Sequence, residues 1–274
     1  MPTALEKQFS EQRDTRRNGD VSSVSRIPVT VRSASSPNVV RLNVPCTACA
    51  MRNVCVPAGF SLSEIARFEG TVVAKRRIAA GQHLFSAGSL SGSLFAIRCG
   101  FVKTSITTDD GREQVTGFHM MGEVVGIDAL ANGRHESDAV ALEDTEVCEI
   151  PFLALENLSH DVPAMQRKLY QLMLDEIQRE RETMLLLGTM RAEERLAAFL
   201  LNLGRRYEAR GFSALRFLLR MSRADIGSYL GLRLETVSRL FSRFQVEGLL
   251  RVDTKSVAIL DAEGLKSVIG RVLN

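Results

Sequence analysis

Three cysteines near the start of the chain have the spacing of metal ligands. Cys46, Cys49 and Cys55 form a Cys-x2-Cys-x5-Cys cluster in a segment with no other structural pattern. Thiols packed this closely in a chain of cytosolic type are more often metal ligands than disulfide partners. The spacing therefore predicts a metal centre that these three residues begin to build.

Three ligands need a fourth from elsewhere in the chain. The candidates are Cys99, Cys148, His83, His119, His135 and His160. Cys99 and Cys148 both lie in strand-like patterns, where a small buried core residue is the alternative interpretation. Thiolates suit both zinc and iron–sulfur clusters, and spacing alone does not separate the two. Structural zinc sites usually bring their ligands as two local pairs, so the residues favour an iron–sulfur centre slightly over zinc.

A second constellation, near the C-terminus, has the pattern of a DNA-binding motif. Ser222 and Asp225 form a capping box that begins a helix over residues 222–230, and Gly231 supplies the positive φ of a tight turn. A second helix follows over residues 234–247. Two short strands around a polar turn, residues 249–252 and 257–260, then resemble the wing of a winged helix-turn-helix.

The second of these helices carries side chains that suit the major groove. Glu235, Ser238 and Arg239 share one helix face, and their side chains match the donors and acceptors of base edges. Arg233, Arg243 and Arg251 suit phosphates, which position a domain without reading sequence. An ordinary exposed helix of mixed charge is the alternative, but helix, turn, helix and wing together favour DNA binding.

Between the two constellations the chain predicts a sheet and a long helix that position them. Short apolar or alternating runs from about Phe68 to Pro151 indicate a sandwich or barrel, with a double-stranded roll the leading expectation. Asp109-Asp110-Gly111 predicts a hairpin turn between two of these runs. A helix over about Pro163–Leu187 follows, and helical patterns resume from Arg191.

The long helix carries an apolar seam at spacings of three and four residues. Packing on its own barrel and pairing with a second copy are both consistent with it. An acidic residue on the seam favours the dimer, because a carboxylate facing its symmetry mate makes association conditional. The predicted dimer seam consists of Tyr170, Met173, Ile177, Glu180, Met184 and Leu187.

Composition narrows the class of protein. The 274 residues are 45% hydrophobic and 24% charged, which suggests about two domains and excludes disorder throughout. Net charge is +3 over residues 1–45, −6 over 46–190 and +6 over 191–274, so the C-terminal end alone is expected to meet a polyanion. No apolar run is long enough for a membrane span, no secretory signal is visible, and no recognisable catalytic motif appears. A cytoplasmic protein that is not an enzyme is expected.

Three stretches resemble the Crp/Fnr family of bacterial transcription regulators, and within it the oxygen-responsive Fnr branch. They are Val147-Cys148-Glu149-Ile150-Pro151-Phe152, Ala192-Glu193-Glu194-Arg195-Leu196-Ala197-Ala198-Phe199 and Glu235-Thr236-Val237-Ser238-Arg239-Leu240. The likeness runs from about Val44 to the C-terminus. It implies an α+β fold, with a β-roll sensor domain of the cyclic-nucleotide-binding type, a long dimerisation helix and a C-terminal winged helix-turn-helix domain.

The resemblance also implies a domain order and a mechanism. The expected domains are a disordered tail (1–43), a cysteine segment (44–60), the β-roll (61–160), the dimerisation helix (161–190) and the DNA-binding domain (191–274). A labile 4Fe-4S cluster would be held by Cys46, Cys49, Cys55 and Cys148. The cluster-bearing homodimer would bind palindromic TTGAT-like sites in double-stranded DNA, and oxygen would convert the cluster to 2Fe-2S and loosen the dimer. RNA polymerase is an expected partner, through the loop 107–112 and the surface near Asp144.

Two departures from the family pattern bear on the interpretation. Arg233 stands where relatives tend to have a hydroxyl cap before the reading helix, and a guanidinium cannot accept the orphan amides. Where cyclic-nucleotide sensors place an Arg-Ser pair, this chain has Glu136 and Asp138, which would repel a phosphate. The alternative function is a zinc-stabilised or small-ligand-responsive Crp-type regulator that senses no gas.

Overall fold

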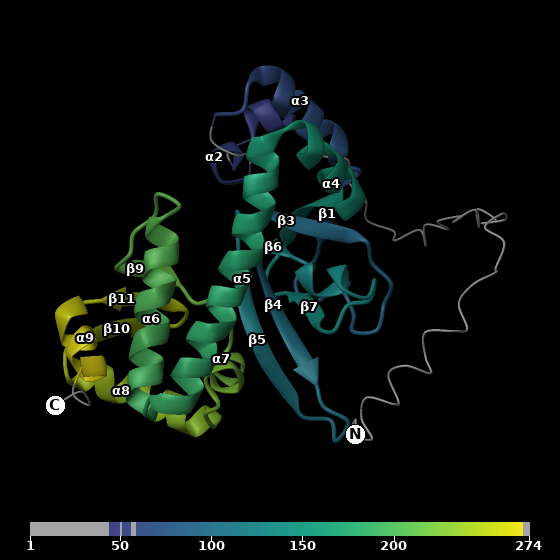
Figure 1. Ribbon diagram of the computed structural model, residues 1–274. Helices are drawn as coiled ribbons and strands as arrows, with labels where there is room; N and C mark the ends of the chain where they lie inside the picture. The colour runs from purple at the N-terminus through teal and green to yellow at the C-terminus, as the bar shows by residue number, and fades with distance from the viewer. Residues whose placement is uncertain (1–43, 50, 56–58, 271–274) are drawn as a thin grey trace, which may run out of the picture. The chain divides into compact units, whose positions relative to one another are not determined.

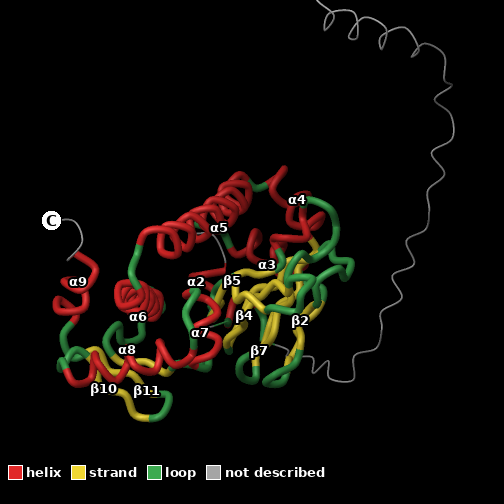
Figure 2. Tube along the Cα trace, turned by 90° about the horizontal axis from the view of Figure 1, so that it is seen from below, coloured by secondary structure: helices red, strands yellow, loops and turns green. Residues whose placement is uncertain are grey.

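The computed structural model describes residues 44–49, 51–55 and 59–270 (Figure 1). The tail expected over 1–43 lies outside the described residues. Figure 2 distinguishes the strands in yellow from the helices in red. The described residues include a sheet region (Ala74–Pro151) and a C-terminal region (Ala192–Gly270).

The sheet region contains two four-stranded antiparallel sheets. One has the order β1-β8-β3-β6 and the other β2-β7-β4-β5. The turn at Gly111, with a φ of 82°, joins β4 to β5 as the sequence predicted. The strands are β1 (Ala74–Ile78), β2 (His83–Phe85), β3 (Ser93–Cys99), β4 (Phe101–Thr107), β5 (Glu113–Met120), β6 (Val124–Val125), β7 (Asp138–Ala141) and β8 (Thr145–Pro151).

Helices precede, interrupt and follow these strands. Contrary to the expectation of a structureless cysteine segment, the chain forms a 3-10 turn η1 (Cys46–Ala48) and a short helix α2 (Arg52–Cys55) there. Phe68, expected to begin the strands, lies in helix α3 (Leu62–Thr71), whose N-terminus is held by a capping box between Ser61 and Glu64. A second 3-10 turn, η2, spans Ile127–Leu130, and α4 spans Phe152–Asp161.

The long helix α5 spans Pro163–Thr189, two residues beyond the expected end, with its proline in the first turn. Its only fully buried residue is Met165, near the N-terminus. Most of its length therefore offers side chains to solvent. No described helix is both long and apolar enough to cross a bilayer.

The C-terminal region forms the predicted winged helix-turn-helix. Ser222 Oγ accepts from the Asp225 amide at 3.0 Å, the Asp225 carboxylate accepts from the Ser222 amide at 2.9 Å, and Gly231 has a φ of 63°. The wing gains a third strand, β9, that the sequence did not reveal. The elements are α6 (Ala192–Glu208), β9 (Arg216–Leu218), α7 (Arg223–Leu230), α8 (Leu234–Val246), β10 (Leu250–Asp253), β11 (Ser256–Ile259) and α9 (Ala262–Gly270), with sheet order β10-β11-β9.

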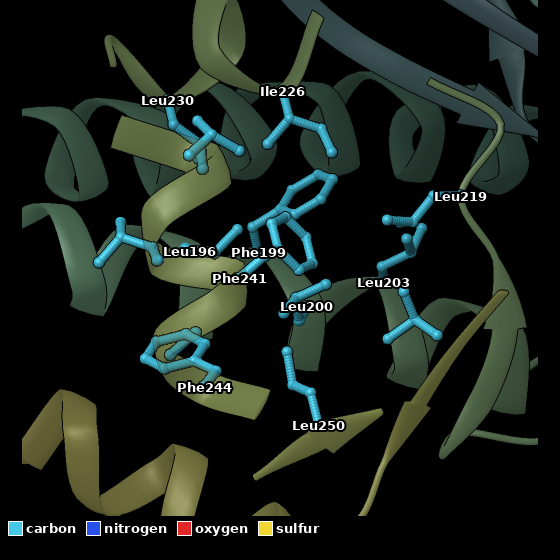
Figure 3. Close-up of a cluster of buried hydrophobic side chains, with 14 of the residues drawn as sticks. Leu196, Phe199, Leu200, Leu203, Leu219, Ile226, Leu230, Phe241, Phe244 and Leu250 are labelled. Carbon is cyan, nitrogen blue, oxygen red and sulfur yellow. The ribbon is translucent and has the colours of Figure 1, made fainter. Parts of the chain in front are cut away.

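One apolar core fills the C-terminal region and extends to strand β5. Figure 3 shows Phe199 and Leu200 of α6 together with Phe241 and Phe244 of α8 among the side chains of this core. Phe118 and Met120 of β5 belong to the same cluster as these α6 and α8 side chains. The expected α+β fold with β-roll, long helix and winged helix-turn-helix is confirmed.

Candidate functional site

Four cysteines from two distant segments line one small pocket. Cys46 begins η1, Cys49 follows it, Cys55 ends α2, and Cys148 lies on strand β8. The pocket wall is completed by apolar and basic side chains: Met51, Arg52, Phe68, Val72, Ala96, Arg98 and Ile150. The fold therefore brings together the thiols that the sequence placed about ninety residues apart.

Burial makes three of these thiols poor acids. It raises the pKa of Cys46 to about 11 and that of Cys55 to about 12, and it also raises the pKa of Cys148. Cys148 and Cys49 contribute to the shifts at Cys46 and Cys55, so the four sulfurs lie within electrostatic range of one another. Without a cation in the pocket the thiols of Cys46, Cys55 and Cys148 are protonated at neutral pH, and binding a metal would release their protons.

The donor set fits a thiolate-bound metal group. All four cysteines are free of disulfides, and soft sulfur ligands suit iron–sulfur clusters and zinc. Among the described residues, however, no three His, Cys, Asp or Glu side chains converge closely enough to hold a metal ion as they stand. The pocket provides suitable donors, and the four cysteines would have to move closer together to bind a metal group.

The other proposed fourth ligands lie elsewhere. Cys99 is exposed at the end of β3, beside Glu146, and His83 is exposed on β2. None of the four histidines lines the cysteine pocket. His119 hydrogen-bonds to Thr104 and Arg179.

His135 and His160 are also accounted for by other neighbours. His135 stacks on Phe85, with ring centroids 3.6 Å apart, and its Nδ1 lies 3.0 Å from Asp128 Oδ1. His160 lies in the last turn of α4 and lines a different pocket. Of the candidates for a fourth ligand, the fold brings Cys148 alone to the pocket.

Helix α8 presents the predicted base-reading residues to solvent. Glu235, Ser238 and Arg239 are exposed, while Val237 and Phe244 on the opposite face are fully buried. The helix begins after Arg233 without a side-chain cap, so the missing hydroxyl does not prevent helix entry. The turn at Gly231 and the apolar face of α8 suffice to position it.

The predicted phosphate contacts differ in their surroundings. Arg233 and Arg251 are exposed and have no ion pair among the described residues. Arg243 forms ion pairs with Glu247 at 2.7 Å and with Glu193 at 3.5 Å. Arg243 would have to leave or share these carboxylates to contact a phosphate.

Sequence reasoning did not identify Arg223 as a residue that stabilises the helix pair. Its guanidinium carbon lies 3.2 Å from the centre of the Phe241 ring, which joins α7 to α8 by a cation–π contact. Burial lowers the pKa of Arg223 to about 10. The position of Arg223 directly after the capping Ser222 indicates only that it lies in the first turn of a helix. Its contact with Phe241 joins two helices, and no local sequence pattern predicts such a contact.

The predicted seam of α5 is exposed. Tyr170, Met173, Ile177 and Met184 are 53%, 40%, 45% and 74% exposed, Glu180 is exposed beside them, and Leu187 is partly buried. A stripe of large apolar side chains left in solvent along a helix is typical of an interface.

A second cavity, lined by residues of the sheet region and of helix α5, is acidic. Its lining includes Asp128, Glu136, Glu176 and Glu180. Asp138, also expected there, accepts a hydrogen bond from the Ala87 amide and does not line the cavity. These carboxylates disfavour a phosphate-bearing ligand.

The fold and these sites define a DNA-binding regulator that combines a sheet region with a winged helix-turn-helix. Residues 75–161 match the cyclic nucleotide-binding domain family, and residues 194–268 match the Crp-like helix-turn-helix domain family. The chain belongs to the Crp/Fnr family of transcription regulators. It is therefore a DNA-binding regulator and not an enzyme, as the sequence predicted.

Its relatives support the placement close to Fnr. The transcriptional regulatory protein Btr of Bordetella pertussis is 44% identical over 82% of this chain and 93% of its own length. The fumarate and nitrate reduction regulatory protein of Escherichia coli K12 is 43% identical over 84% and 92%. Among solved structures, FixK2 from Bradyrhizobium japonicum has a TM-score of 0.66 and 30% identity, covering 71% of this chain and 96% of that one.

Proposed function

We propose that this protein is an oxygen-responsive transcription regulator, active in the cytoplasm as a homodimer when oxygen is low. The observation that carries the proposal is the shared pocket of Cys46, Cys49, Cys55 and Cys148. These residues would hold a 4Fe-4S cluster. When bound, such a cluster would supply reactivity toward oxygen.

Two helices of the chain would carry the other parts of the function, which are dimer formation and DNA reading. The exposed seam of α5 pairs with the same seam of a second copy, since a symmetric dimer uses one surface twice. Glu180 on that seam faces its symmetry mate and keeps the dimer weak enough to be switched. Glu235, Ser238 and Arg239 then read the two halves of a palindromic TTGAT-like site.

The dimer also activates transcription by contacting RNA polymerase. The loop 107–112 and the surface near Asp144 are the proposed contacts. Asp110 and Arg112 form an ion pair of 2.7 Å in that loop, and Asp144 forms one of 2.8 Å with Arg77. Both pairs are exposed, so both can be reached by a partner.

The test is a visible spectrum of protein purified without oxygen, recorded before and after exposure to air. Iron, acid-labile sulfide, zinc and DNA binding are measured on the same samples. The proposal expects iron and sulfide, a spectrum that changes in air and DNA affinity that falls with it. Protein without iron or sulfide contradicts the proposal, and stoichiometric zinc that survives air supports a zinc-stabilised regulator that senses no gas.

A further inference from the structure

A buried carboxylate joins the sheet region to the C-terminal region. Glu123, in the turn between β5 and β6, is 9% exposed and accepts from two arginines of the C-terminal region. Arg206 Nη2 lies 2.6 Å from Glu123 Oε2, and Arg210 Nη2 lies 2.7 Å from Glu123 Oε1. The Met120 amide donates to the same carboxylate at 3.1 Å. These three charged residues form the Glu123 clamp.

The arginines also donate to main-chain oxygens of that turn and of the end of β5. Arg206 Nη2 donates to the carbonyl of Phe118, and Arg210 Nε donates to the carbonyl of Met121. Each guanidinium thus contacts the segment around Glu123 at two points. Two contacts fix the orientation of the guanidinium as well as its distance from that segment. Lys103 of β4 also pairs with Asp225 of α7 at 2.8 Å, and the Val115 amide donates to Ser228 Oγ at 2.8 Å, so the clamp is one of several polar contacts between the two regions.

Because the three charges are largely buried, the stability of the clamp depends strongly on each of its three residues. Burial alone would raise the pKa of Glu123, but the nearby Arg206 and Arg179 outweigh burial and lower it to about 2. Glu123 is therefore ionised at neutral pH. Removing one partner of a buried ion pair leaves an uncompensated charge, which is far more costly than losing a surface pair.

The main chain of Glu123 is held by the strand that also neighbours Cys148. Ile97 of β3 donates to the Glu123 carbonyl at 2.9 Å and accepts from the Gly122 amide at 2.7 Å. In the same strand, Ala96 pairs with Val124 of β6 on one side and with Cys148 of β8 on the other. Strand β3 alone thus separates the cysteine pocket from the turn that carries the clamp.

We propose that Glu123 is a positioning residue for DNA recognition. Through Arg206 and Arg210 it fixes the orientation of the C-terminal region relative to the sheet region. The inference rests on the proposed dimeric function. A two-fold site needs both recognition helices at one fixed spacing, about 34 Å for adjacent grooves. Binding of one helix to one half-site has no such requirement.

The experiment compares a full palindromic duplex with a half-site duplex, at one salt concentration, for the full-length protein and Glu123→Gln. Glutamine keeps the shape and removes the charge that holds both arginines. We expect the variant to lose about tenfold or more in affinity for the full site, because misdirected domains cannot engage both halves together. Half-site affinity and bound iron should stay at the wild-type level.

Further variants separate positioning from general damage. Glu263→Gln, an equal change in an exposed α9 pair with Lys266, should leave both affinities unchanged. Glu123→Asp should recover part of the full-site affinity. Arg210→Lys keeps a positive charge but loses the second contact, and its full-site loss should be smaller than that of Glu123→Gln.

Each result has a distinct meaning. A wild-type preference for the full site that persists in Glu123→Gln overturns the inference alone. Equal losses on both duplexes, or lost iron, also overturn it, because the variant would then act through folding or the cofactor. A wild-type protein that binds both duplexes equally overturns the dimeric function together with the inference.

Discussion

His119 should make the stability of the protein fall steeply in mild acid. The side chain, on β5, is 4% exposed, with Nε2 3.1 Å from Thr104 Oγ1 and Nδ1 3.2 Å from Arg179 Nη1. Because a guanidinium only donates, Nδ1 must accept, and the single ring proton resides on Nε2. Burial, and then the charge of Arg179, lowers the pKa of His119 from 6.5 to about 3.

The sign and size of the effect follow from that pKa. Between pH 6.5 and 3 the unfolded chain binds a proton at His119 that the folded chain does not, so stability falls as pH falls. From pH 7 to pH 5 the loss from this one group is about 2 kcal/mol. Protonating Nδ1 would also remove the acceptor for Arg179 of helix α5, and with it the hydrogen bond that joins β5 to α5.

The assay is denaturant unfolding at pH 7 and pH 5 for the wild type, His119→Gln and His83→Gln. His119→Gln is expected to be less stable at pH 7, because a buried contact is altered. Its free energy of unfolding should nevertheless change by about 2 kcal/mol less between the two pH values. His83 is exposed, so His83→Gln should keep the wild-type pH dependence. Equal pH dependence in all three proteins would refute the reasoning.

Four further perturbations test the sites. Cys148→Ala should abolish iron retention under anaerobic purification while Cys99→Ala retains it, and equal iron loss in both would show that the ligand assignment is wrong. Arg239→Ala should relax specificity at one base pair by about 1–3 kcal/mol in a binding assay with mutated sites, whereas uniform weakening would make Arg239 a phosphate contact. Gly227→Ala should destabilise the protein by about 1–3 kcal/mol in thermal or denaturant unfolding. The added Cβ would lie 2.6 Å from a carbonyl oxygen of the following turn. Unchanged stability would mean that the turn can shift at little cost. Glu180→Leu should tighten the dimer about tenfold in analytical ultracentrifugation, since repulsion between paired carboxylates is of the order of 1.4 kcal/mol, and an unchanged equilibrium would place Glu180 off the seam.

Local signals explain why the helix-turn-helix was predictable. The capping box at Ser222, the positive φ of Gly231 and the apolar spacing of α8 all act within a few residues, so sequence and structure agree there. The same holds for the hairpin at Gly111 and for the proline that begins α5.

Contacts between distant segments explain what was missed. Strand β9 exists because β11 pairs with it. The short helix at Cys55 packs against a core formed by distant segments, so its own residues do not predict it. Cys99 and Cys148 have similar strand patterns, and only the pairing of β3 with β8 places one in the pocket and the other at a strand end. The Glu123 clamp joins residues more than eighty positions apart, beyond the reach of any local pattern.

The same long-range pairing changes the meaning of the basic C-terminal end. Its net charge of +6 suggested a surface that meets DNA as a whole. Arg206 and Arg210 are instead bound to Glu123, and Arg220 forms an ion pair of 2.9 Å with Glu143 of the sheet region. Positive charge at this end therefore has two uses: part of it attaches the C-terminal region to an acidic sheet region, and another part, on and around α8, is left to attract the phosphate backbone.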